Sequence, residues 1–151
     1  MNKLYAAIAL SVLTMSVLPV PQANAEVLIT KEEAELPASA NVAMTTRGLT
    51  RGPGIEQVSP GANQNVSSPL PLKIKFQIRN DVEIDPASIK LTYMKLKPVD
   101  LTARLKGHIK PDGIEMDQAE VPPGVHSLRL DLKDKRGRVA TAIIKLTVVD
   151  K

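Results

Sequence analysis

The sequence predicts a small all-β protein, and three observations support that class. Residues 125–149 fit two long strands around a tight turn at Asp134-Lys135-Arg136-Gly137, because apolar and polar side chains alternate on both sides of it. Shorter alternating segments recur upstream, between turns rich in proline and glycine. The chain has no cysteine. Because so long a hairpin needs other strands to cover its apolar face, we expect a β-sandwich held by packing alone.

The first 25 residues have the layout of a secretory signal peptide. Lys3 gives a basic start, residues 4–20 are mostly apolar, and Ala23-Asn24-Ala25 is an A-x-A cleavage pattern. A membrane anchor is the weaker alternative, because a spanning helix needs about 20 apolar residues and usually has no such site behind it. The chain has no cysteine that could carry a lipid at the mature N-terminus, so we expect no lipid anchor. We therefore expect cleavage before Glu26 and a periplasmic or secreted product without a membrane span.

Residues 26–53 are expected to form a flexible tail or linker before the sandwich. Thr30 and Glu33 have the spacing of a capping box, which predicts one or two helical turns over residues 31–36. The following residues, up to Gly54, are mostly small and polar. A flexible spacer is the simpler interpretation. The alternative is a recognition segment that becomes ordered on a partner.

The sandwich is expected over residues 54–151, with about seven antiparallel strands. The strands upstream of the final hairpin are expected at residues 55–58, 72–78, 89–94, 99–105 and 114–121. Period-two alternation places one parity of each strand in the core. The large inward candidates are Leu72, Ile74, Phe76, Ile78, Ile89, Leu91, Tyr93, Leu128, Leu130, Leu132, Ile144, Leu146 and Val148.

Three stretches resemble a bacterial immunoglobulin-like domain of the disulfide-free, fibronectin III-like kind. They are residues 55–61 with Val66, residues 121–130 with a Pro-Gly entry into a strand, and the Asp-x-x-Gly turn within residues 134–138. The resemblance covers residues 55–150 and implies an immunoglobulin-like sandwich in a small exported protein. The chain departs from antibody domains, since it lacks their two cysteines and buried tryptophan. These motifs are structural, so they imply fold and not activity.

Composition argues against several function classes. Removing residues 1–25 takes Lys3 from the 20 lysines and arginines and nothing from the 16 acidic residues, which leaves a net charge of +3. That charge is dispersed, and Phe76 and Tyr93 are the only remaining aromatic residues, so nucleic-acid binding is not expected. No hydrolase, metalloprotease or phosphate-binding motif is present in the sequence. We therefore expect no enzyme and no cofactor.

A periplasmic metal-handling role, for copper or calcium, is the alternative function. Acidic residues at every second position from Asp81 to Asp85 could offer oxygens to calcium, but Pro86 stands where an EF-hand loop needs glycine. Copper carriers use histidine and methionine clusters, and here these residues are scattered. A polar turn and ordinary packing explain them more simply. The remaining candidates are Asp112, Glu115, Asp117, Glu120, His108, His126, Met44, Met94 and Met116.

One surface predicts protein binding. In an immunoglobulin-like order the third strand and the final hairpin share a sheet. Its outer face would carry Lys90, Thr92, Met94, Arg129, Asp131, Lys133, Thr141, Ile143 and Lys145. The partner-binding candidates among them are Met94, Arg129, Lys133, Ile143 and Lys145. The last strand would also expose Val139 and Val149, so a partner strand could add to its edge, unless a loop or the tail covers it. The expected function is an exported, non-enzymatic binding or assembly module that contacts an envelope protein.

Overall fold

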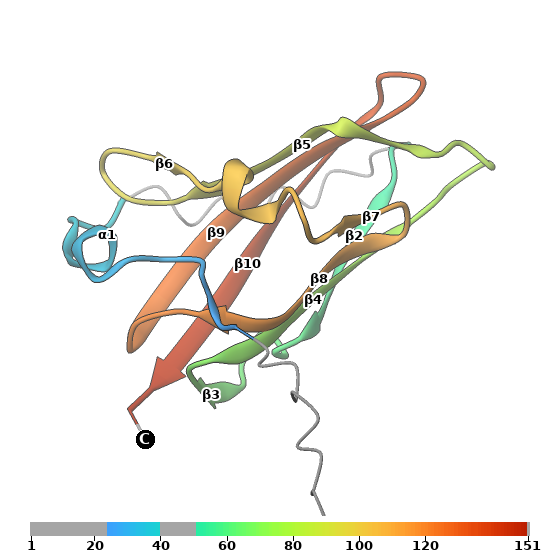
Figure 1. Cartoon of the computed structure of the whole chain (residues 1–151). Coiled ribbons are helices and arrows are strands. Elements are labelled where there is room, and N and C mark those ends of the chain that lie inside the picture. The colour runs from blue at the N-terminus through green and yellow to red at the C-terminus, as the bar shows by residue number, and fades with distance from the viewer. Residues whose placement is uncertain (1–23, 40–50, 151) are drawn as a thin grey trace, which may run out of the picture.

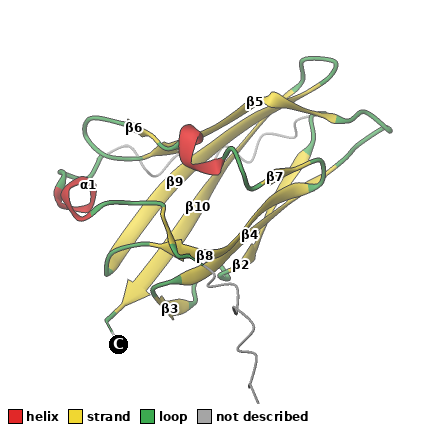
Figure 2. Cartoon of the chain, viewed as in Figure 1, coloured by secondary structure: helices red, strands yellow, loops and turns green. Residues whose placement is uncertain are grey.

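The computed structural model describes residues 24–39 and 51–150, which form a sandwich of two β-sheets (Figure 1). The first sheet has the order β1-β8-β4-β2, with β7 also beside β8, and the second has the order β3-β10-β9-β5-β6 (Figure 2). The expected signal peptide lies outside the described residues except for Asn24 and Ala25, as does Met44. The strands of the first sheet are β1 (Glu26–Val27), β2 (Gly54–Ser59), β4 (Leu70–Gln77), β7 (Ile109–Lys110) and β8 (Gly113–Glu120). Those of the second are β3 (Asn65–Ser67), β5 (Ile84–Tyr93), β6 (Val99–Asp100), β9 (Gly124–Asp134) and β10 (Val139–Val149).

The strand order is that of an immunoglobulin-like sandwich, which confirms the predicted fold class. From β2 in the first sheet the chain passes to β3, which pairs in parallel with β10 in the second sheet. It returns to the first sheet in β4, and then crosses to β5 and β6. After β8 in the first sheet, the β9–β10 hairpin completes the second. The chain thus crosses repeatedly between the two sheets, and β5, β9 and β10 share one sheet as the resemblance implied.

Alternation of apolar and polar residues produces the core. In β9 the three leucines at 128, 130 and 132 are fully buried, and the residues between them face outward. The opposite sheet contributes Leu72, Ile74 and Phe76 from β4. Twelve of the thirteen expected core residues are buried. Ile78 is the exception: β4 ends at Gln77, the chain turns at Asn80 and Asp81 with positive φ, and the Ile78 side chain is 47% exposed.

The strand expected over residues 99–105 is wrong beyond Asp100. The 3-10 helix η1 (Thr102–Leu105) follows β6 instead. The Asp100 carboxylate accepts a hydrogen bond from the Thr102 backbone N–H at 2.9 Å and so favours a turn. Leu101, just before η1, and Leu105, at its end, are both fully buried and belong to the hydrophobic core.

The flexible tail expected over residues 26–53 is wrong for residues 26–39. After β1, helix α1 (Lys31–Glu35) forms with the predicted capping box between Thr30 and Glu33. Leu28 and Ile29 are 0% and 1% exposed and belong to the core, so apolar burial orders the segment. The folded unit therefore begins near residue 26, not at 54. Residues 40–50 lie outside the described part of the chain.

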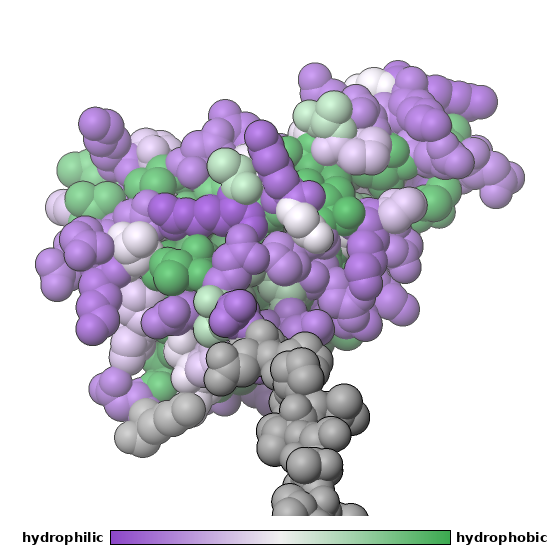
Figure 3. Space-filling view, viewed as in Figure 1, coloured by the Kyte–Doolittle hydropathy of each residue, from purple (hydrophilic) through white to green (hydrophobic). Residues whose placement is uncertain are grey.

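Residues 26–38, called here the N-terminal clasp, join the two sheets along one side. β1 pairs in parallel with β8 of the first sheet, and Ala38 forms an antiparallel bridge with Lys95, just after β5 of the second. Figure 1 shows α1 at the side of the sandwich beside β6. In the same view, hydrophilic side chains dominate the surface and apolar groups show between them (Figure 3). The clasp occupies an edge where a sandwich would otherwise expose strand backbone.

Candidate functional site

The predicted partner-binding residues lie together on the outer face of β5, β9 and β10. Strand register places Arg129 of β9 between Thr92 of β5 and Ile143 of β10. Further along β9, Ser127 is opposite Lys145, and its carbonyl accepts a hydrogen bond from the N–H of Met94. Lys133 lies at the far end of β9, paired with Val139. We call this surface the basic face and define it by Lys90, Thr92, Met94, Val125, Arg129, Asp131, Lys133, Val139, Thr141, Ile143 and Lys145. The strand register thus places the predicted side chains of β5, β9 and β10 at neighbouring positions, and their role in binding a partner stays a prediction.

Charge on the basic face is only partly neutralised. Asp131 is its central carboxylate, and it accepts hydrogen bonds from Arg129 Nε at 3.1 Å and Thr141 Oγ1 at 2.6 Å. The other cations are Lys90, Lys133 and Lys145, all exposed. Among the described residues, none of these three lysines forms an ion pair within 4.0 Å. Three ammonium groups therefore face solvent.

The outer face of the first sheet is electrostatically different. Glu115 on β8 binds Lys73 at 2.8 Å and also forms an ion pair with Lys110. Hydrogen bonds from these two lysines lower the pKa of Glu115 to about 2. Lys75 is exposed on the same sheet and forms no ion pair among the described residues, so it is a matched reference for the lysines of the basic face.

The edge of β10 is closed at several of the positions where a partner strand could add. The Gln57 side-chain amide donates to the Lys145 carbonyl at 2.9 Å and accepts from the Lys145 N–H at 3.3 Å, as a neighbouring strand would. β3 pairs with residues 147–149 of the same edge. Strand addition at Lys145 and beyond is therefore blocked, whereas the side chains of the basic face remain directed outward. The face, and not this edge, is the better candidate for binding.

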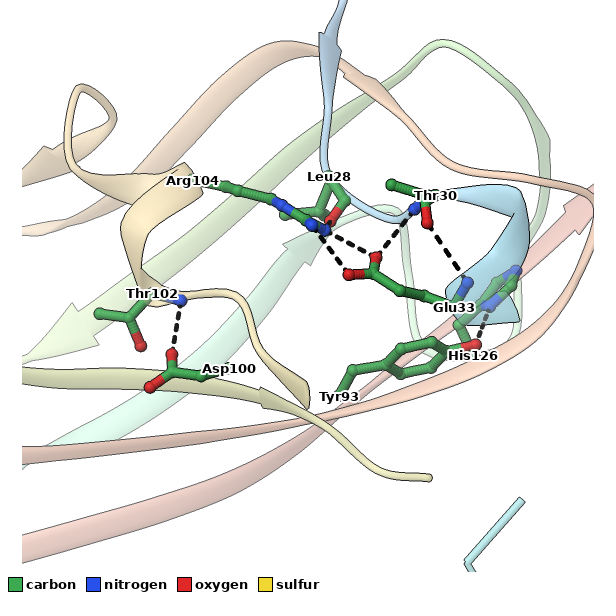
Figure 4. Close-up of polar contacts among 8 residues, drawn as sticks. All are labelled: Leu28, Thr30, Glu33, Tyr93, Asp100, Thr102, Arg104 and His126. Atoms are coloured by element: carbon green, nitrogen blue, oxygen red, sulfur yellow. Dashed lines mark hydrogen bonds and ion pairs between the residues drawn. The ribbon is translucent and has the colours of Figure 1, made fainter. Parts of the chain in front are cut away.

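The N-terminal clasp is fixed by a partly buried network of charged and polar groups (Figure 4). The two terminal guanidinium nitrogens of Arg104, Nη1 and Nη2, bind the Glu33 carboxylate at 2.7 and 2.8 Å, and Nη1 also donates to the Leu28 carbonyl at 2.7 Å. The backbone N–H of Thr30 donates to the same carboxylate at 2.9 Å. The hydrogen bond from Arg104 is the main cause that lowers the pKa of Glu33. The resulting bidentate pair ties the clasp to η1.

A second network lies under the end of the clasp. Tyr93 Oη and His126 Nδ1 are 2.7 Å apart, and His126 Nε2 lies 2.8 Å from the Pro122 carbonyl. Because a carbonyl only accepts, Nε2 carries the proton and Nδ1 accepts from Tyr93. Burial raises the pKa of Tyr93 to about 12 and lowers the pKa of His126. His126 is buried and has the same strand parity as Leu128, so it packs at the end of the core.

Lys95 connects that buried pair to the clasp. Its ammonium lies 4.9 Å from the centroid of the Tyr93 ring and donates to the carbonyls of Ala34 and Leu36 at 2.7 and 2.8 Å. Sequence reasoning missed Lys95 and Arg104, because nothing local distinguishes them from surface cations. The apolar triplet at residues 27–29 was the available signal that this segment packs.

The candidate metal ligands do not come together. Glu83 forms an ion pair with Lys135, and the Asp85 carboxylate accepts from the Ala87 N–H. His108 Nε2 lies 2.6 Å from a Glu26 carboxylate oxygen, whereas His126 contacts Tyr93 and the Pro122 carbonyl. The two histidines therefore have different partners. Met116 is in the core. In the described ranges, no three histidine or acidic side chains are grouped so that they could hold a metal ion.

Comparison with known proteins gives similarity in outline only. No protein-family model matches the chain, and no curated protein does. Fibronectin(III)-like modules of Clostridium thermocellum CbhA are 10% identical with a TM-score of 0.41, over 65% of this chain and 47% of theirs. An engineered protein (TM-score 0.44) and murine CRIg (TM-score 0.43) are also 10% identical, each over 65% of this chain. The matched region is 20% of the engineered protein and 98% of murine CRIg. This chain thus spans less than half of the CbhA modules and a fifth of the engineered protein, and the fold assignment depends on its own strand order.

Within residues 24–39 and 51–150, no helix has the length and apolar character needed to cross a membrane.

Proposed function

We propose that this protein is an exported, non-enzymatic binding module that contacts another protein through the basic face. The observation that supports this is the convergence of Met94, Arg129, Lys133, Ile143 and Lys145 from adjoining strands on one outward surface. A rigid sheet fixes the spacing of such side chains without a loop that must first be ordered, which reduces the entropic cost of binding.

The composition of the face suits a protein partner. Val125 at one end is 71% exposed and Val139 at the other is 49% exposed, and the half-buried Ile143 lies between cationic residues. Interfaces commonly combine a small apolar contact area with charged groups at its margin. Export is part of this proposal because residues 1–25 have the layout of a signal peptide, and an envelope protein would then be the partner.

Site-specific photo-crosslinking in the native envelope tests the proposal. A photoreactive amino acid would replace Lys145 or Lys133 on the basic face, and Lys75 on the outer face of the first sheet would be the matched control position. We expect a discrete adduct from the two basic-face positions and none from position 75. Adducts of equal yield from all three positions, or from position 75 alone, would exclude the basic face as the binding surface.

A further inference from the structure

We infer that the partner of the basic face presents an acidic surface, with carboxylates placed to meet Lys90, Lys133 and Lys145. This inference rests on the proposed function and adds the chemistry of the partner to it. Its basis is that these three ammonium groups form no ion pair among the described residues, while Asp131, the carboxylate between them, is already bound by Arg129 and Thr141.

The lysines are spread over a definite area. Lys133 and Ser127 are six residues apart on β9, and Ser127 is opposite Lys145 on β10. At about 3.4 Å per residue, Lys133 and Lys145 are therefore about 20 Å apart along the strands. Lys90 is opposite Asp131 on the other side of β9, so the three lysines extend across all three strands. An extended acidic segment, or a second sheet, could reach all of them at once.

Asp131 shows how this surface holds a carboxylate. Arg129 donates to it through Nε, and Thr141 donates its hydroxyl from the neighbouring strand. A carboxylate that lies on the sheet thus receives donors from two adjacent strands. The same row also includes Lys90, which is opposite Asp131 on the side away from Thr141. The partner's carboxylates would form ion pairs with Lys90, Lys133 and Lys145, whose ammonium groups face solvent.

Two further carboxylates lie at the borders of the face and hydrogen-bond locally. Asp85 is paired with Lys133 in the strand register, and its Oδ1 accepts from the Ala87 N–H at 3.0 Å. Asp100, opposite Thr92 on β6, accepts from the Thr102 N–H at 2.9 Å. The hydrogen bonds from Thr102 lower the pKa of Asp100, and the charge of Lys90 lowers it further. Acidic and basic side chains therefore alternate across the face, which restricts where an acidic partner can dock.

Two other anionic partners fit less well. Stacking of single-stranded nucleic acid needs exposed aromatic rings, and both aromatic residues of the described chain, Phe76 and Tyr93, are buried. Recognition of anionic lipids typically uses a cluster of about four to eight cations. The basic face has four, of which Arg129 is bound to Asp131, and it has acidic borders. An acidic protein surface is the partner that this mixture favours.

Nuclear magnetic resonance titration of the exported chain tests the inference. The probe is a capped peptide of about ten alternating glutamate and valine residues, long enough to span the three lysines. We expect shifts of the amide resonances of Lys90, Lys133 and Lys145, and about threefold or greater weakening when ionic strength rises from about 0.05 to about 0.3 M. Lys133→Glu combined with Lys145→Glu should abolish the shifts, and Lys75→Glu should leave them unchanged.

Control probes decide between outcomes. A peptide in which lysine replaces glutamate should not bind, and vesicles of phosphatidylglycerol should not move these resonances. Equal binding of both peptides, binding of vesicles alone, or no shift with the acidic peptide would overturn the inference. The proposed function is judged separately, by the adduct formed with the native partner. If the adduct from position 145 is lost with Ile143→Asp but persists when Lys90 and Lys133 are reversed, the binding module stands and the acidic partner does not.

Discussion

The β9–β10 hairpin and the N-terminal clasp bury aliphatic side chains in the same core, but they are attached to it in different ways. The hairpin has a continuous register from Val139 opposite Lys133 to Val148 opposite Gly124. The clasp has a short register with β8 at Glu26 and Val27, after which the N–H groups of Leu28 and Ile29 donate to the Glu120 carbonyl. What the clasp lacks in strand pairing it gains from Arg104 and Lys95, whose side chains bind its carbonyls and its Glu33 carboxylate.

This difference determines how each region responds to damage. Disruption of the hairpin affects both its neighbours in the sheet and the opposite sheet, so the whole fold loses stability. The clasp is a chain segment with few backbone bonds to the sandwich, and it can detach as a unit. A substitution within the clasp therefore costs no more than the free energy of its docking, and substitutions at several clasp positions should not add.

The largest effect is expected from Leu130→Ala in the hairpin. Leu130 is fully buried and lies between Leu91 of β5 and Ala142 of β10. Removing its isobutyl group leaves a cavity that the two sheets cannot close, so the free energy of unfolding should fall by about 2–5 kcal/mol. Chemical denaturation measures this, with Arg129→Ala on the outward side of the same strand as the control. An unchanged denaturation midpoint would show that Leu130 is not in the core.

A smaller loss is expected from Leu28→Ala in the clasp. The side chain is as buried as that of Leu130, but detachment of the clasp limits the cost to about 2–3 kcal/mol. Hydrogen exchange should show faster exchange in residues 26–38 while the β9–β10 hairpin remains protected. Val27→Ala, at a side chain that is 43% exposed, is the control. If Leu28→Ala accelerates exchange equally in both regions, the clasp is not a separate unit.

The ion pair of the clasp should contribute less than its apolar anchor. Glu33→Gln removes the charge that Arg104 binds in a partly buried site, and should cost about 1–2 kcal/mol. The pKa of Glu33 is lowered in the folded state, so this contribution is present above the ordinary carboxyl pKa and is lost as pH falls through the folded value. A double-mutant cycle with Arg104→Gln measures the coupling. Strict additivity of the two substitutions would contradict the pairing.

The buried imidazole under the clasp should make stability sensitive to acid. Burial lowers the pKa of His126, so the folded state binds fewer protons than the unfolded state once pH falls below the ordinary value of about 6.5. Stability is then complete above that pH and declines below it, by up to about 1.4 kcal/mol per pH unit. Denaturation at several pH values should show this slope, and His126→Gln should flatten it between neutral and mildly acid pH. A variant with the original slope would assign the acid sensitivity to other groups.

The same comparison explains what could be predicted from the sequence. The hairpin was predictable because its signal is local: Leu128, Leu130 and Leu132 alternate with charged residues within one segment. The basic face followed from the same parity. The clasp was not predictable as a packed element, because its stabilising partners, Arg104 and Lys95, are distant in sequence and look like surface cations. Its local signals were the apolar triplet at residues 27–29 and the capping box, and α1 was predicted correctly from the capping box.

The smallest stability effect is expected on the basic face, where Lys145→Glu should change the free energy of unfolding by about 0.5 kcal/mol or less. Lys133→Glu should cost slightly more, because Asp85 lies opposite it on β5. Their ammonium groups form no ion pair among the described residues, so removing them breaks no internal contact. Lys73→Glu should be more harmful, because it removes the 2.8 Å ion pair with Glu115 and places a second carboxylate opposite it. Thermal unfolding of the three variants measures the contrast. If the basic-face lysines were as costly to reverse as Lys73, they would have structural roles, and a loss of binding in those variants would no longer report on the partner.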